Sequence, residues 1–269
     1  MTQPPALRIA TWNINSLRLR LKLLTTLSEK LDPDVICLQE TKVPDELFPP
    51  EGLAAIGYPH VVYAGMKGYN GVAIFSRTPL RRVEEVPDWC GRGDCRHIAA
   101  EVETAGGPVT MHNFYVPAGG DVADREVNPK FGHKLDFIAE AQAWFAALPP
   151  KRSVLVGDLN IAPLEHDVWS HKQLLDVVSH TPVETAGLLA WQREGFIDAV
   201  RHIVPDSEKL YTWWSYRNRD WKVANRGRRL DHVWITPDLV PVSQTILVEA
   251  RDWIQGSDHV PVCVEVGCG

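Results

Sequence analysis

Apolar and polar positions alternate along the chain in short segments that predict most of its strands. Residues 7–13 alternate with period two, as a half-buried strand does, and they end on Asn13. Residues 153–156 form a brief apolar run after the breaker pair Pro149-Pro150, which is typical of a buried strand. We expect further strands at 35–38, 58–64, 72–76, 98–103, 109–115, 233–236 and 260–266.

Three other stretches have helical spacing. Ser16 precedes leucines that follow an i, i+4, i+7 pattern, and Asp32-Pro33-Asp34 ends that pattern, so a helix capped by Ser16 is predicted. The leucines are Leu17, Leu21, Leu24, Leu27 and Leu31. Residues 131–148 and 181–193 predict two more helices.

The order of these elements predicts the fold class. Helices and strands are interleaved, but tight glycine turns join many of the strands, as they join antiparallel neighbours. This mixture indicates an α+β fold in which two sheets pack face to face and helices lie outside. No repeat, low-complexity tract or linker divides the chain, so we expect residues 1–269 to form a single domain.

The strand predicted at 153–156 carries a candidate catalytic pair at its end. Asp158 and Asn160 follow Gly157 at a spacing of two, which in extended chain puts both side chains on one side. A carboxylate and an amide placed in this way can bind a hard cation, take a proton from water or hold an oxyanion. As an isolated motif, the pair is better explained as an Asx turn that leaves the strand.

Polar groups of the same kind recur at other predicted strand ends. They are Asn13, Glu40, Asn70, Tyr115, Asp231, Asp258 and His259. Each one alone has a structural explanation, such as a turn former, a solvated acid, a core ring or a buried histidine. If the strand ends converge, several carboxylates share one site, which is costly without a cation. Oxygen ligands without soft donors indicate Mg²⁺ or Mn²⁺ and not zinc.

Composition and charge narrow the setting of the protein. The formal net charge of −6 argues mildly against a protein that simply coats nucleic acid, but not against an enzyme with an acidic metal site. The five cysteines include no CxxC pair, which favours a reducing compartment. Residues 1–7 lack a signal pattern, and no apolar run is long enough to span a bilayer. We therefore expect a cytoplasmic protein that does not enter a membrane.

A stretch between Tyr211 and Arg229 interleaves aromatic and basic residues. Its members include Trp213, Trp214, Tyr216, Arg217, Arg219, Lys222, Arg226 and Arg228. Such a loop suits contact with phosphates and stacking or wedging at bases. A tryptophan-rich core strand followed by a solvated turn explains the same residues equally well.

Seven segments together resemble the exonuclease III family of AP endonucleases, within the wider endonuclease/exonuclease/phosphatase superfamily. They are WNINSLR (12–18), LQETK (38–42), YNGVAI (69–74), NFYVP (113–117), GDLNIAP (157–163), RLD (229–231) and SDH (257–259). They occur in the family's order and span almost the whole chain. The resemblance implies a DNase I-like four-layer αββα sandwich of two mixed sheets flanked by helices, with the site at one sheet edge.

The resemblance also implies roles for the acidic and amide residues. Glu40 is expected to be the principal metal ligand, with Asn13 and Asp258 beside it. Asp158 would activate the attacking water and touch a second metal. Asn160 would hold the water, a phosphate oxygen or that metal.

Of the remaining site residues, three are expected to be catalytic and three to bind DNA. His259 would contact the scissile phosphate, Asp231 would orient and charge His259, and Tyr115 would donate to the phosphate. Asn70 would line the site, and Arg217 is our first candidate for a contact to the DNA backbone. Trp213 takes the aromatic position of a pocket that selects a flipped nucleotide lacking its base.

The function implied is a magnesium-dependent DNA repair nuclease, in which manganese would substitute, acting as a monomer on double-stranded DNA. It would cut 5′ to abasic sites, trim blocked 3′ ends as a 3′-phosphodiesterase and 3′-phosphatase, and degrade duplex DNA 3′→5′. Ala118 and Arg228 depart from the family's pattern. The resemblance therefore does not determine one phosphate contact, at Ala118, or the width of the pocket, at Arg228.

Two alternatives remain at this stage. A superfamily phosphodiesterase could act on RNA or another phosphoester. A catalytically inactive regulator that binds RNA or protein is disfavoured, because the candidate catalytic residues are all present.

Overall fold

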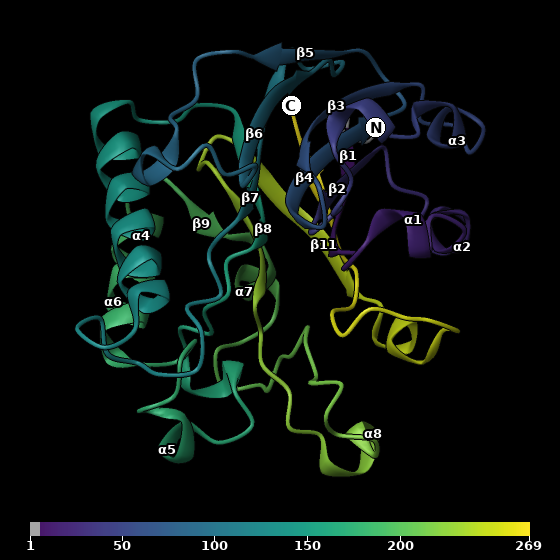
Figure 1. Ribbon diagram of the computed structural model, residues 1–269. Coiled ribbons are helices and arrows are strands. Elements are labelled where there is room, and N and C mark those ends of the chain that lie inside the picture. Colours follow the sequence, from purple (N-terminus) through teal and green to yellow (C-terminus); the bar gives the residue numbers. More distant parts are fainter. Residues whose placement is uncertain (1–5) are drawn as a thin grey trace.

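Two six-stranded sheets packed face to face form the centre of the molecule in a computed structural model, which describes residues 6–269 (Figure 1). The first sheet has the order β11-β12-β1-β2-β4-β3 and the second β5-β6-β7-β8-β10-β9. Among the described strands, β1–β2 and β7–β8 pair in parallel and the other neighbours are antiparallel. Both sheets are therefore mixed, as expected.

The strands of the first sheet are β1 (Ala6–Asn13), β2 (Val35–Gln39), β3 (His60–Met66), β4 (Tyr69–Ser76), β11 (Val240–Ile246) and β12 (Val262–Gly267). Those of the second are β5 (Leu80–Val83), β6 (His97–Val102), β7 (Val109–Tyr115), β8 (Ser153–Asp158), β9 (Ile197–Asp198) and β10 (Asp231–Ile235). The strands β5, β9 and β11 were not predicted. Because β9 has two residues and β11 is a largely exposed edge strand, neither offers a clear apolar alternation.

Helices cover the outer face of each sheet (Figure 1). The α-helices are α1 (Leu17–Arg20), α2 (Leu23–Leu31), α3 (Pro50–Ala54), α4 (Pro129–Ala147), α5 (His171–Leu174), α6 (Pro182–Gln192), α7 (Ala199–Ile203) and α8 (Trp221–Ala224). Short 3₁₀ turns are η1 (Asp45–Leu47), η2 (Trp89–Gly91), η3 (Glu165–Asp167) and η4 (Val248–Asp252). The helices α1 to α3 lie beside the first sheet, and α4 and α6 beside the second (Figure 1). This confirms the four-layer αββα sandwich.

Alternating side chains of the central strands fill the layers on both faces. In β8, Val154 and Val156 join the core between the two sheets, whereas Leu155 joins the core beneath α4 and α6. Burial on both faces explains why the central strands read as continuous apolar runs. No helix within residues 6–269 is long and apolar enough to cross a bilayer.

The helix predicted at 17–31 is wrong in one respect, because it is broken into α1 and α2. Ser16 makes no side-chain capping bond and has a φ of 93°. The backbone N–H groups of Ser16 and Leu17 donate to the carbonyl oxygens of Glu40 and Thr41 at 2.8 and 2.9 Å. These loop carbonyls satisfy donors that a cap would otherwise serve. The first turn is thereby tied to a site residue.

The strand ends that carry polar residues converge on one edge of the sandwich. The parallel strands β1 and β2 end there, while β4 and β12, which run antiparallel to their neighbours, begin there. In the second sheet, Tyr115, Asp158 and Asp231 are register partners on the adjacent strands β7, β8 and β10. A hydroxyl and two carboxylates are thus brought side by side by strand pairing alone.

Candidate active site

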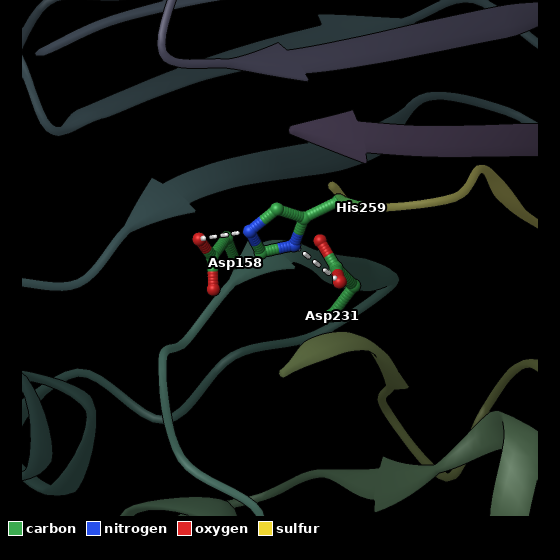
Figure 2. Close-up of side chains that lie close together, drawn as sticks. All are labelled: Asp158, Asp231 and His259. Atoms are coloured by element: carbon green, nitrogen blue, oxygen red, sulfur yellow. Dashed lines mark hydrogen bonds and ion pairs between the residues drawn. The ribbon is translucent and has the colours of Figure 1, made fainter. Parts of the chain in front are cut away.

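His259 lies between two carboxylates in the centre of this edge (Figure 2). Its Nδ1 is 2.9 Å from Oδ2 of Asp231, and its Nε2 is 3.6 Å from Oδ2 of Asp158. The indole Nε1 of Trp12 donates to the carbonyl oxygen of His259 at 3.0 Å, and the hydroxyl of Thr212 donates to Asp231 at 2.6 Å. Contacts to the ring and to the backbone of His259 therefore both fix the position of its imidazole.

The charge states of this group follow from burial and from the close carboxylates. Burial alone would lower the pKa of His259, but Asp231 and Asp158 outweigh burial and raise that pKa well above its usual value. Burial is the main reason why the pKa of Asp158 is raised, and the neighbouring Asp231 adds to the shift. His259 is therefore expected to be a cation at neutral pH.

Glu40 and Asp158 are joined through the amide of Asn13. The Nδ2 of Asn13 donates to Oε1 of Glu40 at 3.0 Å and to Oδ2 of Asp158 at 2.8 Å. The ammonium of Lys42 lies 2.8 Å from Oε2 of Glu40. Burial would raise the pKa of Glu40, but the hydrogen bonds from Asn13 and Lys42 outweigh it and lower that pKa. Glu40 is thus ionised at neutral pH.

Asp258 is the second ionised carboxylate on the side of the first sheet. Its Oδ1 accepts from Nδ2 of Asn15 at 3.1 Å, and its Oδ2 accepts from Nε1 of Trp213 at 2.9 Å. Burial opposes ionisation, but the charge of His259 and the bond from Trp213 outweigh it and lower the pKa of Asp258. Asn15 also accepts from Lys42 at 2.6 Å, so one polar network connects Asp258 to Glu40.

The donor set around Glu40 fits a hard divalent cation. Glu40 and Asp258 supply ionised oxygens, and Oδ1 of Asn13 accepts the backbone N–H of Asn15 at 3.1 Å while keeping a second lone pair. Lys42 supplies the positive charge that lies against Glu40 in this structure. All these protein donors are oxygens, the type that Mg²⁺ and Mn²⁺ prefer.

Asp158, Asp231 and His259 also bring three potential metal-ligand atoms within 4.8 Å of one another. His259, however, presents both ring nitrogens to the two carboxylates, and its raised pKa keeps the ring protonated. A protonated imidazole does not coordinate a metal. We therefore interpret these three residues as an ion-paired group.

The Asp158–Asn160 pair forms both of the arrangements that were considered from the sequence. The backbone N–H of Asn160 donates to Oδ1 of Asp158 at 2.9 Å, which is an Asx-type turn. The amide of Asn160 also reaches Oδ2 of Asp158 at 3.2 Å and donates to the carbonyl oxygen of Val116 at 2.9 Å. The turn thus holds the pair at the site.

Tyr115 and Asn70 lie at the same edge. Tyr115 is buried, and burial together with the carboxylates of Glu40 and Asp158 raises the pKa of its hydroxyl well above the usual value, which keeps it a donor. The carbonyl oxygen Oδ1 of Asn70 is buried without a hydrogen-bond partner among the described residues. The backbone N–H of Lys42 donates to the main-chain oxygen of Asn70 at 2.9 Å, which brings it beside the Glu40 loop.

Trp213 and Arg217 line a cavity of about 890 Å³. Trp213 is half-buried, whereas its neighbour Trp214 is in the core, so the two explanations offered for the aromatic run apply to different residues. Arg217 is exposed at the cavity rim. The contacts of Trp213 and Arg217 with DNA stay predictions.

Sequence reasoning missed a buried lysine beneath the site. Lys134 of α4 is completely buried, lies 2.5 Å from Glu184 and donates to the main-chain oxygens of Asn160 and Ala118 at 2.8 and 3.3 Å. It therefore ties together two loops of the site, including the loop that carries Ala118. A lysine on the buried face of α4 was the only signal in the sequence.

A second buried ion-pair network precedes Asp231. Arg229 pairs with Asp167 at 2.8 Å and with Asp198 at 2.6 Å, and Arg201 pairs with Asp167 at 2.6 Å. These partners come from distant parts of the chain, so local periodicity does not reveal them. The network holds the segment that leads into β10.

Comparisons with known proteins cover nearly the whole chain. Residues 10–259 match the model of the Endonuclease/Exonuclease/phosphatase family. Exodeoxyribonuclease III of Haemophilus influenzae is 32% identical over 270 residues, which are 96% of this chain and 99% of the relative. An AP endonuclease from Archaeoglobus fulgidus has a TM-score of 0.86 at 32% identity, covering 96% of this chain and 98% of that chain.

A further solved structure extends the comparison to a DNA complex. It is a 3′ phosphatase from Neisseria bound to a product DNA hairpin, with a TM-score of 0.86, 30% identity and coverage of 96% of this chain and 98% of that one. The family match begins in β1 and ends on His259, so it includes every strand end that contributes to the site. Since sequence, fold and site agree, this chain belongs to the endonuclease/exonuclease/phosphatase family, in its exonuclease III branch.

Proposed function

We infer that this chain is a metal-dependent DNA repair nuclease of the exonuclease III type, which hydrolyses phosphodiester bonds. The observation that carries this inference is one ionic group, Asp158–His259–Asp231, beside the oxygen ligands of Glu40 and Asp258. The names of the relatives, exodeoxyribonuclease III, AP endonuclease and 3′ phosphatase, support the same class of reaction.

The proposed substrates are duplex DNAs that carry abasic sites or blocked 3′ ends. The enzyme cuts 5′ to an abasic site, removes phosphate and other blocking groups from 3′ ends, and degrades strands 3′→5′. Three arginines in the lining of the cavity beside the acidic site, Arg217, Arg226 and Arg228, support binding of a polyanion in spite of the net charge of −6. We further propose a monomer. A cytoplasmic location is supported by the five free thiols.

The roles of the residues follow from their charge and hydrogen bonds. Asp158 accepts a proton from the attacking water, for which its raised pKa is favourable near neutral pH. His259 and Tyr115 donate to oxygens of the scissile phosphate and stabilise the charge that develops there. Asp231 orients His259 and stabilises its cationic form, and Asn160 positions the water.

We propose that the metal is Mg²⁺, with Mn²⁺ able to replace it, held by Glu40, Asp258 and Asn13. Asp158 and Asn160 are the further candidates for contact with a second ion. When bound, such a cation supplies electrostatic stabilisation of the phosphate and of the leaving 3′-oxygen.

The test is cleavage of a duplex that carries one tetrahydrofuran abasic analogue. We expect incision on the 5′ side of the analogue with Mg²⁺ and loss of activity in EDTA, restored by Mg²⁺ or Mn²⁺. An RNA duplex of the same sequence and a phosphoinositide serve as competing substrates. Preference for either of them, or full activity in EDTA, would contradict the proposal.

A further inference from the structure

A large cavity adjoins the candidate active site and shares Trp213 with it. The cavity has a volume of about 890 Å³, and its lining includes Trp169, Trp213, Trp214, Arg217, Arg226 and Arg228. The indole Nε1 of Trp213 donates to Oδ2 of Asp258 at 2.9 Å. The cavity is therefore next to the place where the proposed function puts the scissile phosphate.

Arg228 is fixed in the wall of this cavity by three contacts. Its Nη1 donates to the carbonyl oxygen of Val178 at 2.9 Å and to the hydroxyl of Ser179 at 2.7 Å. Its guanidinium carbon lies 5.5 Å from the ring centroid of Trp213, so the two planar groups are in cation–π contact. The guanidinium is thus held in one orientation without using all of its donors.

The remaining donors of Arg228 are free to bind a ligand. Within residues 6–269, neither Nε nor Nη2 makes a hydrogen bond, and no carboxylate lies within 4 Å of the guanidinium. These two N–H groups lie along one edge of the planar group, which is the geometry of bidentate pairing. Burying half of such a cation is unfavourable in free energy unless a partner accepts hydrogen bonds from its free N–H groups.

We propose that this cavity receives a complete unpaired nucleotide, base included, and that Nε and Nη2 of Arg228 donate to acceptor atoms of that base. The inference rests on the proposed function, because the nucleotide is the one joined to the scissile phosphate. Arg228 then determines how well intact 3′-terminal nucleotides are removed relative to abasic sites.

The size and the chemistry of the cavity support a base and not only a sugar. Pockets that enclose a whole drug-sized ligand measure roughly 300–1,000 Å³, and a nucleotide belongs to this size class. Trp169 and Trp213, both half-buried, provide aromatic surface, which bases of any identity can contact by stacking. The tetrahydrofuran analogue has no base and no hydroxyl at C1′, so its ring oxygen alone cannot accept from both donors of the free edge of Arg228. The family resemblance implies a pocket for a nucleotide that lacks its base, and this inference adds a nucleotide that keeps its base.

The test compares two reactions of the same protein. One substrate is a duplex with a mismatched 3′-terminal nucleotide, prepared with each of the four bases, and the other carries an internal tetrahydrofuran. For Arg228→Leu we expect the ratio of terminal-nucleotide removal to tetrahydrofuran incision to fall roughly 5- to 150-fold, which is the range that a bidentate arginine contact to a base contributes. Arg228→Lys keeps the charge but lacks the planar edge, and it should lower the ratio nearly as much.

The identity of the terminal base gives a second readout that a merely structural role would not change. The bidentate edge of an arginine pairs best with O6 and N7 of guanine, so wild-type protein should remove guanine fastest. This preference should disappear in Arg228→Leu and Arg228→Lys. Arg219→Leu removes one exposed positive charge from the same loop outside the cavity and should change neither the ratio nor the preference.

Three outcomes would overturn the inference. Arg228→Lys could keep both the wild-type ratio and the base preference, or Arg219→Leu could lower the ratio as much as Arg228→Leu. Wild-type protein could also incise tetrahydrofuran but leave every intact terminal nucleotide in place. Failure of the proposed function is distinct from these, because wild-type protein would then cleave neither DNA.

Discussion

At the scale of single residues, the site depends on side chains that make more than one bond. Asp158 accepts from Asn13 and Asn160 while it faces His259, and Glu40 accepts from Asn13 and Lys42. Each carboxylate is therefore held in place by neutral amides as well as by a cation. Because these bonds fix geometry independently of catalysis, substitutions that keep shape can separate chemistry from folding.

Asp158→Asn should abolish most of the turnover while preserving binding. The amide keeps the size of the carboxylate but cannot take a proton from water, and losing a general base costs on the order of 10²–10⁴ in rate. Single-turnover incision of tetrahydrofuran duplex measures the loss, and fluorescence anisotropy measures binding. Asp176→Asn, at an exposed position, is the control. Near wild-type turnover by a folded Asp158→Asn protein would contradict the assignment.

Glu40→Gln should raise the magnesium concentration that gives half-maximal activity. The substitution removes one of the two ionised carboxylates proposed to hold the cation, and ligand charge sets the affinity of such sites. A magnesium titration of incision, with exposed Glu46→Gln as the matched control, measures the shift. Identical titration curves for Glu40→Gln and wild type would show that Glu40 is not the principal ligand.

At the scale of elements, buried ion pairs position the loops between the strands. Lys134 joins α4 to the start of α6 through Glu184, and it also binds the loop carbonyls of Ala118 and Asn160. Glu184 in turn accepts from the backbone N–H groups of Ser179 and Thr181. One lysine therefore connects two helices with two segments of the site.

Lys134→Met should lower the free energy of unfolding by about 3–5 kcal/mol, because it leaves the Glu184 carboxylate buried without its cation. Urea unfolding measures the change. The double variant Lys134→Met/Glu184→Gln should recover part of the loss, since the glutamine carries no charge and keeps an acceptor for the backbone donors. Equal losses in the single and double variants would mean that the unpaired charge is not the cause.

The loop that carries Trp213 should affect recognition more than chemistry. Trp213→Ala removes an aromatic wall of the cavity, and aromatic surfaces of this kind contribute roughly 1–3 kcal/mol per base that stacks on them. In the proposed binding mode a terminal 3′-phosphate carries no nucleotide that would enter the cavity, so the ratio of tetrahydrofuran incision to 3′-phosphate release should fall, with an upper range of roughly 5- to 150-fold if the sugar contact equals that of a base. Trp213→Phe keeps an aromatic ring and should retain most of the ratio.

Arg217→Ala provides the contrast within the same loop. As an exposed candidate for a phosphate contact, its loss should weaken both reactions together and reduce the salt slope of DNA binding by about one unit. The Trp213 interpretation fails if Trp213→Ala behaves like Arg217→Ala. It also fails if Trp213→Ala melts far below wild type without changing the ratio.

At the scale of the whole molecule, both sheets share one central core. Residues from the two sheets form a single apolar cluster, with separate clusters beneath the helices on each outer side. We therefore propose that residues 1–269 behave as one domain with one cooperative unfolding transition. The core also contains His97 and His112, which are buried and whose ring nitrogens lie 3.2 Å apart.

These two histidines should make the fold sensitive to acid. Burial lowers the pKa of His112 to about 4 and the pKa of His97 well below its usual value of 6.5. Above about pH 6.5 both are neutral in the folded and unfolded states and have no effect. Between about pH 6.5 and 4 the unfolded chain takes up protons that the folded chain does not. The free energy of unfolding should therefore decrease as the pH is lowered, by up to about 1.4 kcal/mol per pH unit for each histidine.

Urea unfolding between pH 7.5 and 5 tests this expectation. His112→Asn keeps a polar atom near the position of Nδ1 but does not titrate. The number of protons taken up on unfolding, which the pH dependence of the unfolding free energy measures, should therefore decrease by about one. His202→Asn, at an exposed position, should leave it unchanged. An unaltered slope in His112→Asn would show that this histidine does not control acid stability.

The sequence by itself determined most strands, two of the three predicted helices and the identity of the polar residues at the strand ends. These features are local, because a strand or helix reveals itself by the period of its own apolar positions. The capping pair Thr181 and Glu184 at the start of α6, for example, lies within four residues. The family segments added the roles, since each is a short stretch of neighbouring residues.

Only the tertiary structure decided which strand ends meet and in what orientation. The register of Tyr115, Asp158 and Asp231 comes from pairing of distant strands, and Trp12 reaches the backbone of His259 across 247 positions. The break between α1 and α2 accompanies the binding of Ser16 to a carbonyl of another loop. The free edge of Arg228 exists because Val178 and Ser179, about fifty residues away, bind its other nitrogen. Such contacts depend on how the chain packs, and local periodicity carries no information about them.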